Sequence, residues 1–519
     1  MYRLRASSAL PVALEDDSLA QGMSGTGCVD DCITAFDESA ALLSNADEAV
    51  VESQMPMPGK MTPIPKLQLA IVCLVRLLEP IGFTQLFPYI NEMVIKLNIL
   101  DDPSKVGFVS GLVESVFAAF QLISIYHWAK ASDAIGRRPV LLLGATGMGL
   151  MTFLFGFSRN LTSILITRSL HGFFAGNIAV VQSVLGELSD PTNQAVMLPI
   201  YGLSWPLGTI IGPMVGGTFS NPADKFPLFD VPLLRQYPYA MPCLITSVFS
   251  VFGIALAYFF MEETLPSEGK KLRKRSKEAK SYGSIPITSA AAPLSAWQLL
   301  AIPSLRSLII SGFALSFVSA AFDTVFVLFA YTPIEVGGLA FNASQIGYSL
   351  SVSGCLSCIV QLFITPILLQ RFSCAKMYHI CMSFWPVPFV ILPFLNLVLR
   401  NGRDEFGEIL PHAHAMVWSG IILVMFISRL TCLAFGFGII LAKEGAPNPS
   451  SLGATNGLVQ MSMSLARAIS PAFSNSTFAA SLESNVLGGN LWVVILAGIA
   501  CLGSLASARL VKESCARKY

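Results

Sequence analysis

Long apolar stretches alternate with short polar segments along most of the chain. A helix needs about 20 mostly apolar residues to cross the hydrocarbon core of a bilayer. The pattern therefore predicts an all-α membrane protein with twelve transmembrane helices. The fourth, fifth and eleventh stretches are rich in Gly, Ser and Asn, so their hydropathy signal is weaker. The predicted spans lie near 68–92, 106–128, 140–158, 162–187, 195–219, 239–261, 305–331, 344–369, 375–398, 415–441, 453–474 and 489–510.

One long polar connection separates the first six stretches from the last six. It contains the basic run KKLRKRSKEAK followed by Ser, Pro and Gly, which is typical of a flexible linker. Two six-helix bundles of similar length, joined in this way, indicate a duplicated, pseudo-symmetric transporter. The predicted organisation is a disordered cytoplasmic tail at 1–65, a first bundle at 66–262, a cytoplasmic linker at 263–303, a second bundle at 304–510 and a cytoplasmic tail at 511–519.

Basic residues gather in alternate connections between the stretches. They occur between the second and third stretches, in the central linker and in the C-terminal tail. Because positively charged loops remain on the cytoplasmic side, we expect both termini to be cytoplasmic. The three N-x-S/T sequons, at Asn160, Asn342 and Asn475, then fall in or beside outer loops. We expect a monomer in the plasma membrane or the vacuolar membrane.

Composition excludes several classes of protein. Only 13% of the residues are charged and the formal net charge is +1, so we expect a lipid bilayer and no nucleic acid as partner. The eleven cysteines are scattered, mostly in apolar stretches, which indicates packing residues. His412 and His414 alone make a weak metal site. No nucleophile–base pair and no Walker A motif occurs, so we expect no enzyme, no catalytic residue, no cofactor and no bound metal.

The connection between the second and third stretches carries a charged turn. Asp133 precedes Gly136, Arg137 and Arg138, and the glycine allows the chain to reverse within a few residues. The aspartate can bind a helix N-terminus or an arginine of a neighbouring helix, and so hold the two halves closed. Arg467 is a candidate partner. The alternative is a turn with a positive-inside anchor, and the spacing does not decide between them.

The fourth and fifth stretches carry glycines at helical spacing. In the fourth, Arg168 and His171 precede two glycines four residues apart, which share one helix face. His171 is either a titrating group or a packing residue. The fifth contains a smooth glycine face and prolines that can bend the helix. Its motif residues are Gly208, Gly212, Pro213, Gly216 and Gly217.

These segments resemble motifs of the major facilitator superfamily. The charged turn resembles motif A, although Ala129 and Ala134 replace its usual glycine and arginine; the Arg168 segment resembles motif B, whose arginine is linked in the family to proton coupling. The fifth stretch resembles motif C of the antiporter branch, and Glu262–Pro266 resembles its P-E-T-L ending. With RLLEPI at 76–81 and LGATNG at 452–457, the chain resembles fungal relatives of the plant zinc-induced-facilitator-like transporters, a drug:proton antiporter type with twelve spans.

Ionisable residues inside apolar spans are costly and are usually functional. Arg76 and Glu79 are three residues apart and share a helix face, so they can pair. We expect Glu79 and Asp323, each on the first helix of its half, to carry the proton, with structural ion pairs as the alternative. The candidates for proton coupling and the substrate cavity are Arg76, Glu79, Glu114, Arg168, His171, Asp323 and Arg429.

The sequence therefore predicts a secondary transporter that exchanges protons for a small organic compound and exports it by alternating access. A uniporter or importer of the same fold remains an alternative, as does a non-transporting membrane sensor. The residues in these motifs concern the conformational change of the transport cycle, so they do not identify the substrate.

Overall fold

The computed structural model describes residues 62–99, 105–190, 192–265, 296–404, 408–447 and 451–516. Most of the predicted N-terminal tail and central linker, and the end of the C-terminal tail, lie outside the described residues. The described chain is helical apart from its connections and one isolated antiparallel bridge between Arg403 and Ile409.

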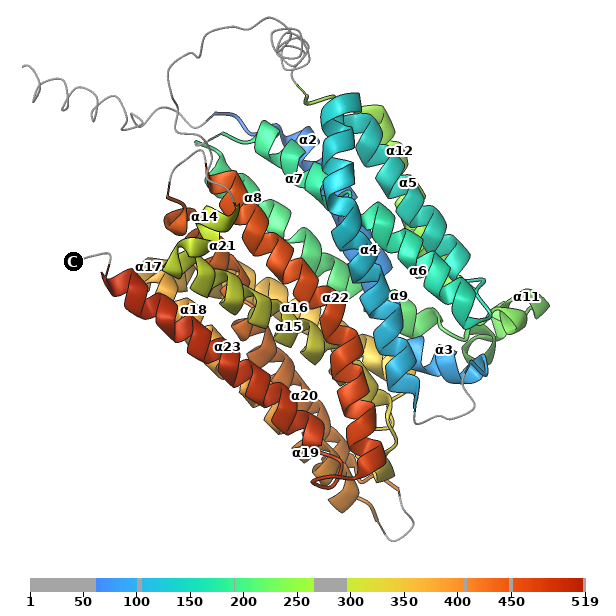
Figure 1. Ribbon diagram of the computed structural model, residues 1–519. Helices are drawn as coiled ribbons and strands as arrows, with labels where there is room; N and C mark the ends of the chain where they lie inside the picture. Colours follow the sequence, from blue (N-terminus) through green and yellow to red (C-terminus); the bar gives the residue numbers. More distant parts are fainter. Residues whose placement is uncertain are drawn as a thin grey trace, which may run out of the picture. The chain divides into compact units, whose positions relative to one another are not determined.

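The first six predicted spans are helical (Figure 1). The fourth and the fifth each consist of two consecutive helices. Shorter helices lie in the connections: α3 (Ile90–Lys96) follows the first span, and α10 (Pro222–Lys225), η2 (Pro227–Phe229) and α11 (Pro232–Gln236) follow the fifth. The spans are α2 (Lys66–Thr84), α4 (Val106–Ile135), α5 (Arg137–Phe155), α6 (Leu161–Ala175) with α7 (Ile178–Leu188), α8 (Gln194–Gly202) with α9 (Ser204–Phe219), and α12 (Ala240–Phe260).

The last six predicted spans are also helical. The short helices α14 (Ala296–Ala301) and η3 (Ile334–Val336) flank the seventh, and a π-helical turn, η4 (Val360–Ile364), interrupts the eighth. The spans are α15 (Pro303–Tyr331), α16 (Ala343–Ile359) with α17 (Thr365–Arg371), α18 (Cys374–Phe384) with α19 (Pro386–Asn401), α20 (Pro411–Thr431) with α21 (Ala434–Gly445), α22 (Leu452–Ser484) and α23 (Leu491–Ala516).

Ten helical segments in the described residues are long and apolar enough to cross a membrane. The two predicted spans outside that set are the fifth and the eleventh, whose hydropathy is weak in the sequence. The fifth is divided where α8 meets α9. The eleventh, α22, is polar, but its serines are satisfied by a neighbour: Ser462 and Ser470 donate to backbone carbonyls of α15 at 3.1 and 2.6 Å. Internal hydrogen bonding of this kind is how polar side chains are accommodated in a membrane helix.

The packing of the first six spans repeats in the last six. In the first half, α2 packs on α9, α4 on α6, and α12 on both α2 and α5. In the second half, α15 packs on α22, α16 on α20, and α23 on both α15 and α18. The chain is therefore folded as two related six-helix bundles. Two pairs of helices join them, α4 with α22 and α9 with α16, and α4 and α22 lie side by side in Figure 1.

The asparagines of the three sequons make structural contacts. Asn160 and Asn342 are the N-cap residues of α6 and α16, and each side chain accepts a hydrogen bond from the third residue of its helix, at 2.8 and 2.9 Å. The interpretation of Asn475 as a residue in or beside an outer loop is wrong. It is buried within α22, and its amide donates to Ser110 on α4 at 3.4 Å. Asn475 belongs to the contact between the halves.

Candidate functional site

The two halves are in close contact at one end, where α4 begins and α22 ends. A Cβ atom on Gly111 would lie 2.6 Å from the carbonyl oxygen of Pro471, so only glycine fits there. Ser115 Oγ accepts a hydrogen bond from the backbone N–H of Ala472 at 2.9 Å. The contact is thus made largely by backbone atoms. The loop charges predict that this is the outer end.

The second contact between the halves, α9 with α16, is made by small residues at the same end. A Cβ on Gly217 would lie 2.6 Å from the carbonyl oxygen of Ala343, and one on Gly347 would lie 2.5 Å from that of Pro213. Ser344 Oγ donates to the carbonyl oxygen of Gly217 at 2.9 Å. Gly217 and Pro213 therefore belong to the contact between the halves.

The other glycines predicted in this motif face α2, within the first half. A Cβ on Gly208 would meet Pro80, and one on Gly212 would lie 2.8 Å from the carbonyl oxygen of Ile81. Gly216 approaches the backbone of Gln85. The glycine face at 208, 212 and 216 thus fixes α9 against α2, while Pro213 and Gly217, each one residue further along, face the second half.

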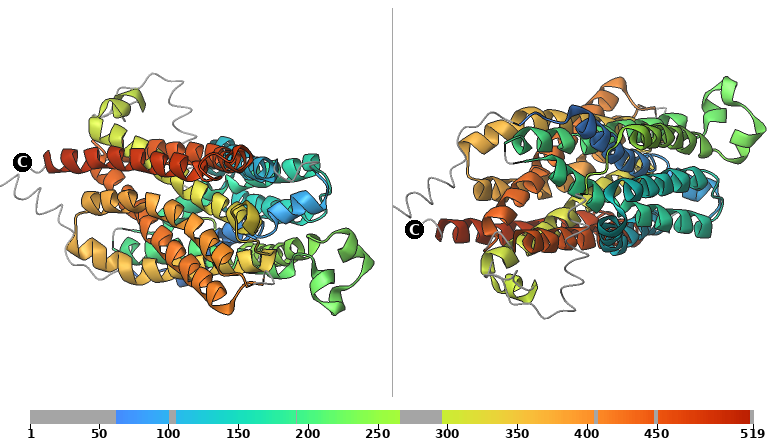
Figure 2. Two further views of the ribbon diagram at one scale, coloured as in Figure 1. Left: turned by 90° about the horizontal axis from the view of Figure 1, so that it is seen from below. Right: turned by 90° about the horizontal axis from the view of Figure 1, so that it is seen from above.

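A lysine outside the spans bridges this contact. Lys225 in α10 donates to the carbonyl oxygen of Gly217 at 2.8 Å and to Ser344 Oγ of α16 at 3.0 Å. Burial lowers the pKa of Lys225. A cation at the C-terminal end of α9 also complements the helix dipole. Figure 2 shows the short helices of this connection projecting beyond the spans.

The predicted pair on α2 forms as the spacing indicates. Arg76 is ion-paired with Glu79, and the second carboxylate oxygen of Glu79 accepts a hydrogen bond from Gln121 of α4 at 2.8 Å. The Arg76 guanidinium also lies over the ring of Trp205, 5.2 Å from its centroid. The buried carboxylate of Glu79 is therefore fully engaged within the first half.

Arg467, the predicted partner of the charged turn, has its described contacts elsewhere. Its guanidinium donates to Ser464, on its own helix, at 3.1 Å. It is close enough to Arg76 and Glu79 to interact with both electrostatically. The structure thus brings Arg467 of the second half near the charge pair on α2.

Asp323 and Arg429, 106 residues apart in sequence, form an ion pair of 2.6 Å in the second half. Asp323 lies beside Phe322, whose ring contacts Trp385 and Phe389 at centroid distances of 6.2 and 5.8 Å. This buried aromatic packing fixes the rotation of α15 and so the position of the carboxylate. Asp323 is thereby held against Arg429.

Arg168 and Glu114 are buried in the first half, with exposed fractions of 2% and 3%. They interact electrostatically, and Glu114 is also coupled to Asp323 of the second half. Arg168 Nη1 lies 3.5 Å from His171 Nδ1. A guanidinium only donates hydrogen bonds, so this imidazole nitrogen accepts and the ring is neutral. The arrangement favours His171 as a residue that positions Arg168.

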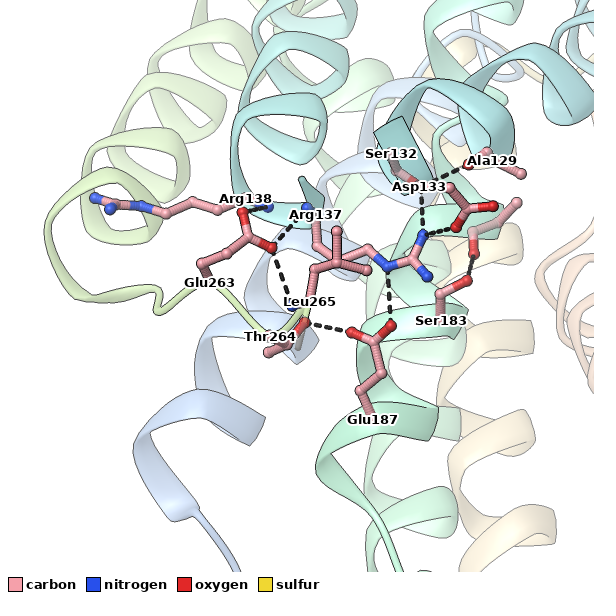
Figure 3. Close-up of polar contacts among 11 residues, drawn as sticks. Ala129, Ser132, Asp133, Arg137, Arg138, Ser183, Glu187, Glu263, Thr264 and Leu265 are labelled. Atoms are coloured by element: carbon pink, nitrogen blue, oxygen red, sulfur yellow. Dashed lines mark hydrogen bonds and ion pairs between the residues drawn. The ribbon is translucent and has the colours of Figure 1, made fainter. Parts of the chain in front are cut away.

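The charged turn after α4 is a network that joins several helices of the first half (Figure 3). Arg137 is bound to Asp133 at 2.8 Å and to Glu187 of α7 at 3.0 Å. Glu263, after α12, accepts from the backbone N–H of Arg137 at 2.8 Å and thus caps the first turn of α5. Gly136 has φ +126°, and a Cβ there would meet this carboxylate, so glycine is required.

Arg138 lies at the edge of this network. Its backbone N–H donates to the Glu263 carboxylate at 3.3 Å, and its guanidinium donates to the carbonyl oxygen of Tyr258. The four predicted latch residues from this turn are therefore together, and they hold α4, α5, α7 and the segment after α12 in one bundle.

Sequence reasoning missed Gln121, Glu187 and Lys225. Gln121 follows Glu114 by seven residues on one helix face, so periodicity could have identified it. Glu187 and Lys225 lie near span ends, where charges are common, and no sequence signal distinguished them. Among the described residues, no three His, Cys, Asp or Glu side chains gather in a way that could hold a metal ion.

Comparisons with known proteins agree with this fold. The family model described as Major Facilitator Superfamily matches residues 72–471. The major facilitator-type transporter psiT2 of Psilocybe cyanescens is 37% identical, over 93% of this chain and 97% of that protein. The multidrug transporter mfsB of Aspergillus fumigatus is 26% identical, over 87% of this chain and 84% of that protein. The ZINC INDUCED FACILITATOR 1 protein of Arabidopsis thaliana is 28% identical, over 84% of this chain and 90% of that protein.

Solved structures show the same fold at low sequence identity. The crystal structure of the human organic anion transporter MFSD10 is 18% identical, with a TM-score of 0.53, and the match covers 86% of this chain and all of that one. A POT family transporter in complex with 5-aminolevulinic acid has a TM-score of 0.61 over 85% of this chain and 96% of that one.

Proposed function

This chain belongs to the major facilitator superfamily of membrane transporters, and from that we propose that it exports a small organic compound in exchange for protons. The observation that carries the proposal is the position of the charged residues. Glu114 lies on α4, one of the helices that join the halves, and is electrostatically linked to Arg168 of one half and Asp323 of the other. A proton at Glu114 therefore changes the interaction between the parts that must move in alternating access.

Glu114 is the carboxylate best suited to carry the proton. Glu79 is engaged by Arg76 and Gln121, and Asp323 by Arg429. Glu114 Oε2 is buried and has no hydrogen-bond partner. We therefore transfer the role predicted for Glu79 and Asp323 to Glu114, and assign those two to structural ion pairs.

The close contact at one end of the bundles represents one state of the transport cycle. With the orientation predicted from the basic loops, the closed end is the outer end, and we expect the site to be reached from the cytoplasm. The proposal includes cytoplasmic termini, a monomer, residence in the plasma or vacuolar membrane, and the bundle boundaries predicted at 66–262 and 304–510. It also includes the drug:proton antiporter type, which the glycine motif of α9 and the multidrug relative support.

The test is a substrate screen with purified protein in proteoliposomes that carry an imposed pH gradient. We expect the pH gradient to drive a transported compound to accumulate on the more acidic side. Protons should move in the opposite direction. Glu114→Gln should abolish the response to the gradient while downhill exchange of the compound persists. Glu513→Gln is the matched control, because Glu513 on α23 also has a buried carboxylate oxygen without a partner but lies outside this site.

The outcome separates the alternatives. A compound that is transported equally with and without the gradient would identify a uniporter and refute antiport. A Glu114→Gln protein that remains coupled would remove this residue from the mechanism, and the same test on Glu79→Gln and Asp323→Asn would then identify the carrier.

A further inference from the structure

Two oppositely charged side chains are buried together without satisfying each other. Glu114 Oε2 and both Nε and Nη2 of Arg168 lie among the buried polar atoms without a hydrogen-bond partner. The two residues interact electrostatically, yet those atoms form no hydrogen bond with one another. Buried polar groups are almost always hydrogen-bonded, and buried charges are paired. The unused hydrogen-bonding capacity therefore requires an explanation.

Aromatic rings lie against the Arg168 guanidinium. The Arg168 guanidinium lies over the rings of Phe117 and Phe83, 4.7 and 5.4 Å from their centroids. Phe83 also contacts Phe117 and Trp205, at centroid distances of 4.8 and 6.4 Å. The neutral ring of His171 occupies the remaining terminal nitrogen of Arg168. Flat apolar surfaces therefore lie beside the unsatisfied donors of Arg168, and the unsatisfied acceptor of Glu114 interacts with the same guanidinium electrostatically.

We propose that Glu114 and Arg168 bind a small zwitterion, with its ammonium group on the Glu114 carboxylate and its anionic group on the Arg168 guanidinium. This inference rests on the proposed transport function and names the substrate class. A simple cation would leave Arg168 unpaired and would meet its charge. A simple anion would likewise leave the Glu114 carboxylate unpaired. Only a ligand with both charges satisfies both groups, and the aromatic rings can pack against a planar apolar frame that carries the two charged groups.

Binding of a zwitterion is also consistent with exchange, in which the substrate and protons move in opposite directions. An ammonium group and a proton compete for the same oxygen of Glu114, so one leaves when the other binds. An anion alone would bind more tightly once Glu114 is protonated, which would couple the two fluxes in the same direction.

The experiment measures binding of three compounds that share one frame: phenylalanine, phenethylamine and 3-phenylpropionate. Each is titrated calorimetrically into the full-length protein in lipid nanodiscs at neutral pH. We expect phenylalanine to bind at least about tenfold more tightly than either single ion, because an analogue that lacks one charged group leaves a buried partner unpaired. Titration in two buffers with different ionisation enthalpies should show protons released as phenylalanine binds.

Two variants assign the ends of the ligand. Glu114→Gln should weaken phenylalanine and phenethylamine but not 3-phenylpropionate. Arg168→Lys keeps the buried positive charge that the fold requires but lacks the planar donor fork, and should weaken phenylalanine and 3-phenylpropionate but not phenethylamine. Glu513→Gln should resemble the unmodified protein in all three titrations.

Equal affinity for phenylalanine and one of the single ions would overturn the proposal, and so would the absence of binding by all three at millimolar concentration. Binding is measured without a proton gradient, so its outcome is separate from that of the transport assay. Selective binding of phenylalanine with no proton-driven exchange would refute antiport and leave the substrate class standing. Proton-driven exchange of compounds with a single charge would support antiport and refute the zwitterionic substrate class.

Discussion

Replacement of Gly217 by alanine tests whether the outer contact between α9 and α16 controls the transport cycle. The added Cβ would lie 2.6 Å from the carbonyl oxygen of Ala343, whereas ordinary contact begins near 3.4 Å. The Cβ is fixed by the backbone of α9 and the oxygen is a backbone atom of α16, so neither can move aside alone. The helices must separate by about 0.8 Å, the difference between these distances, or tilt by an equivalent amount.

That separation breaks hydrogen bonds across the contact. The bond from Ser344 Oγ to the Gly217 carbonyl oxygen, now 2.9 Å, would lengthen to about 3.7 Å, beyond hydrogen-bonding distance. Overpacking of this kind typically costs about 1–3 kcal/mol. Because the cost falls only on the closed outer end, the equilibrium should shift away from that state by about 5- to 150-fold.

The assay is the rate at which a cysteine at the outer seam reacts with a membrane-impermeant maleimide. Ser110, on α4, is 1% exposed in the closed state and is a suitable reporter as Ser110→Cys in a background without reactive native cysteines. Gly217→Ala should accelerate its labelling. Gly436→Ala is the matched control, because a Cβ at Gly436 would meet no atom within 4 Å. Equal labelling rates in the two variants would refute the reasoning.

Three further changes follow from polar contacts outside the membrane core. Arg137→Lys should lower the free energy of unfolding by about 1–3 kcal/mol, seen as a lower melting temperature, because one ammonium group cannot replace the three side-chain contacts of the guanidinium. Lys225→Met removes the bond to Ser344 and should accelerate labelling of the same outer reporter. Hydrogen bonds, chiefly from Thr192, lower the pKa of Asp190 below 3.8. The stabilisation that they provide is therefore present above pH 3.8 and is lost as the pH falls through the lowered pKa. Increased deuterium exchange of this loop in acid would show the loss.

The fold could be predicted because a bilayer imposes strong constraints on sequence. Spanning helices must be long and apolar, and ten of the twelve predicted spans satisfy that criterion in the structure. The other two were recognisable only by their place in the pattern and by their motifs. Their polar residues and glycines are tolerated because they face α2, α15 and α16.

The site could be predicted only in part. The Arg76–Glu79 pair follows from helix periodicity, since three residues separate its members. Asp323 finds Arg429 across 106 residues, and a single sequence contains no signal for such a contact. Glu79 and Asp323 therefore looked as available for a proton as Glu114 did. The electrostatic interaction of Arg467 with the charges on α2 was missed for the same reason, because it depends on how the two bundles meet.

The position of Glu114 explains how protonation or ligand binding at this residue can affect the contact between α4 and α22. Gly111, which lies against Pro471, precedes Glu114 by three residues, so both occupy one face of α4. Ser115, the next residue, holds the backbone of Ala472. A proton or an ammonium group at Glu114 changes its attraction to Arg168 and its repulsion from Asp323, and any resulting rotation of α4 acts directly on a contact made of backbone atoms. Such a contact has little side-chain freedom with which to absorb the movement, so a small displacement is sufficient to open it.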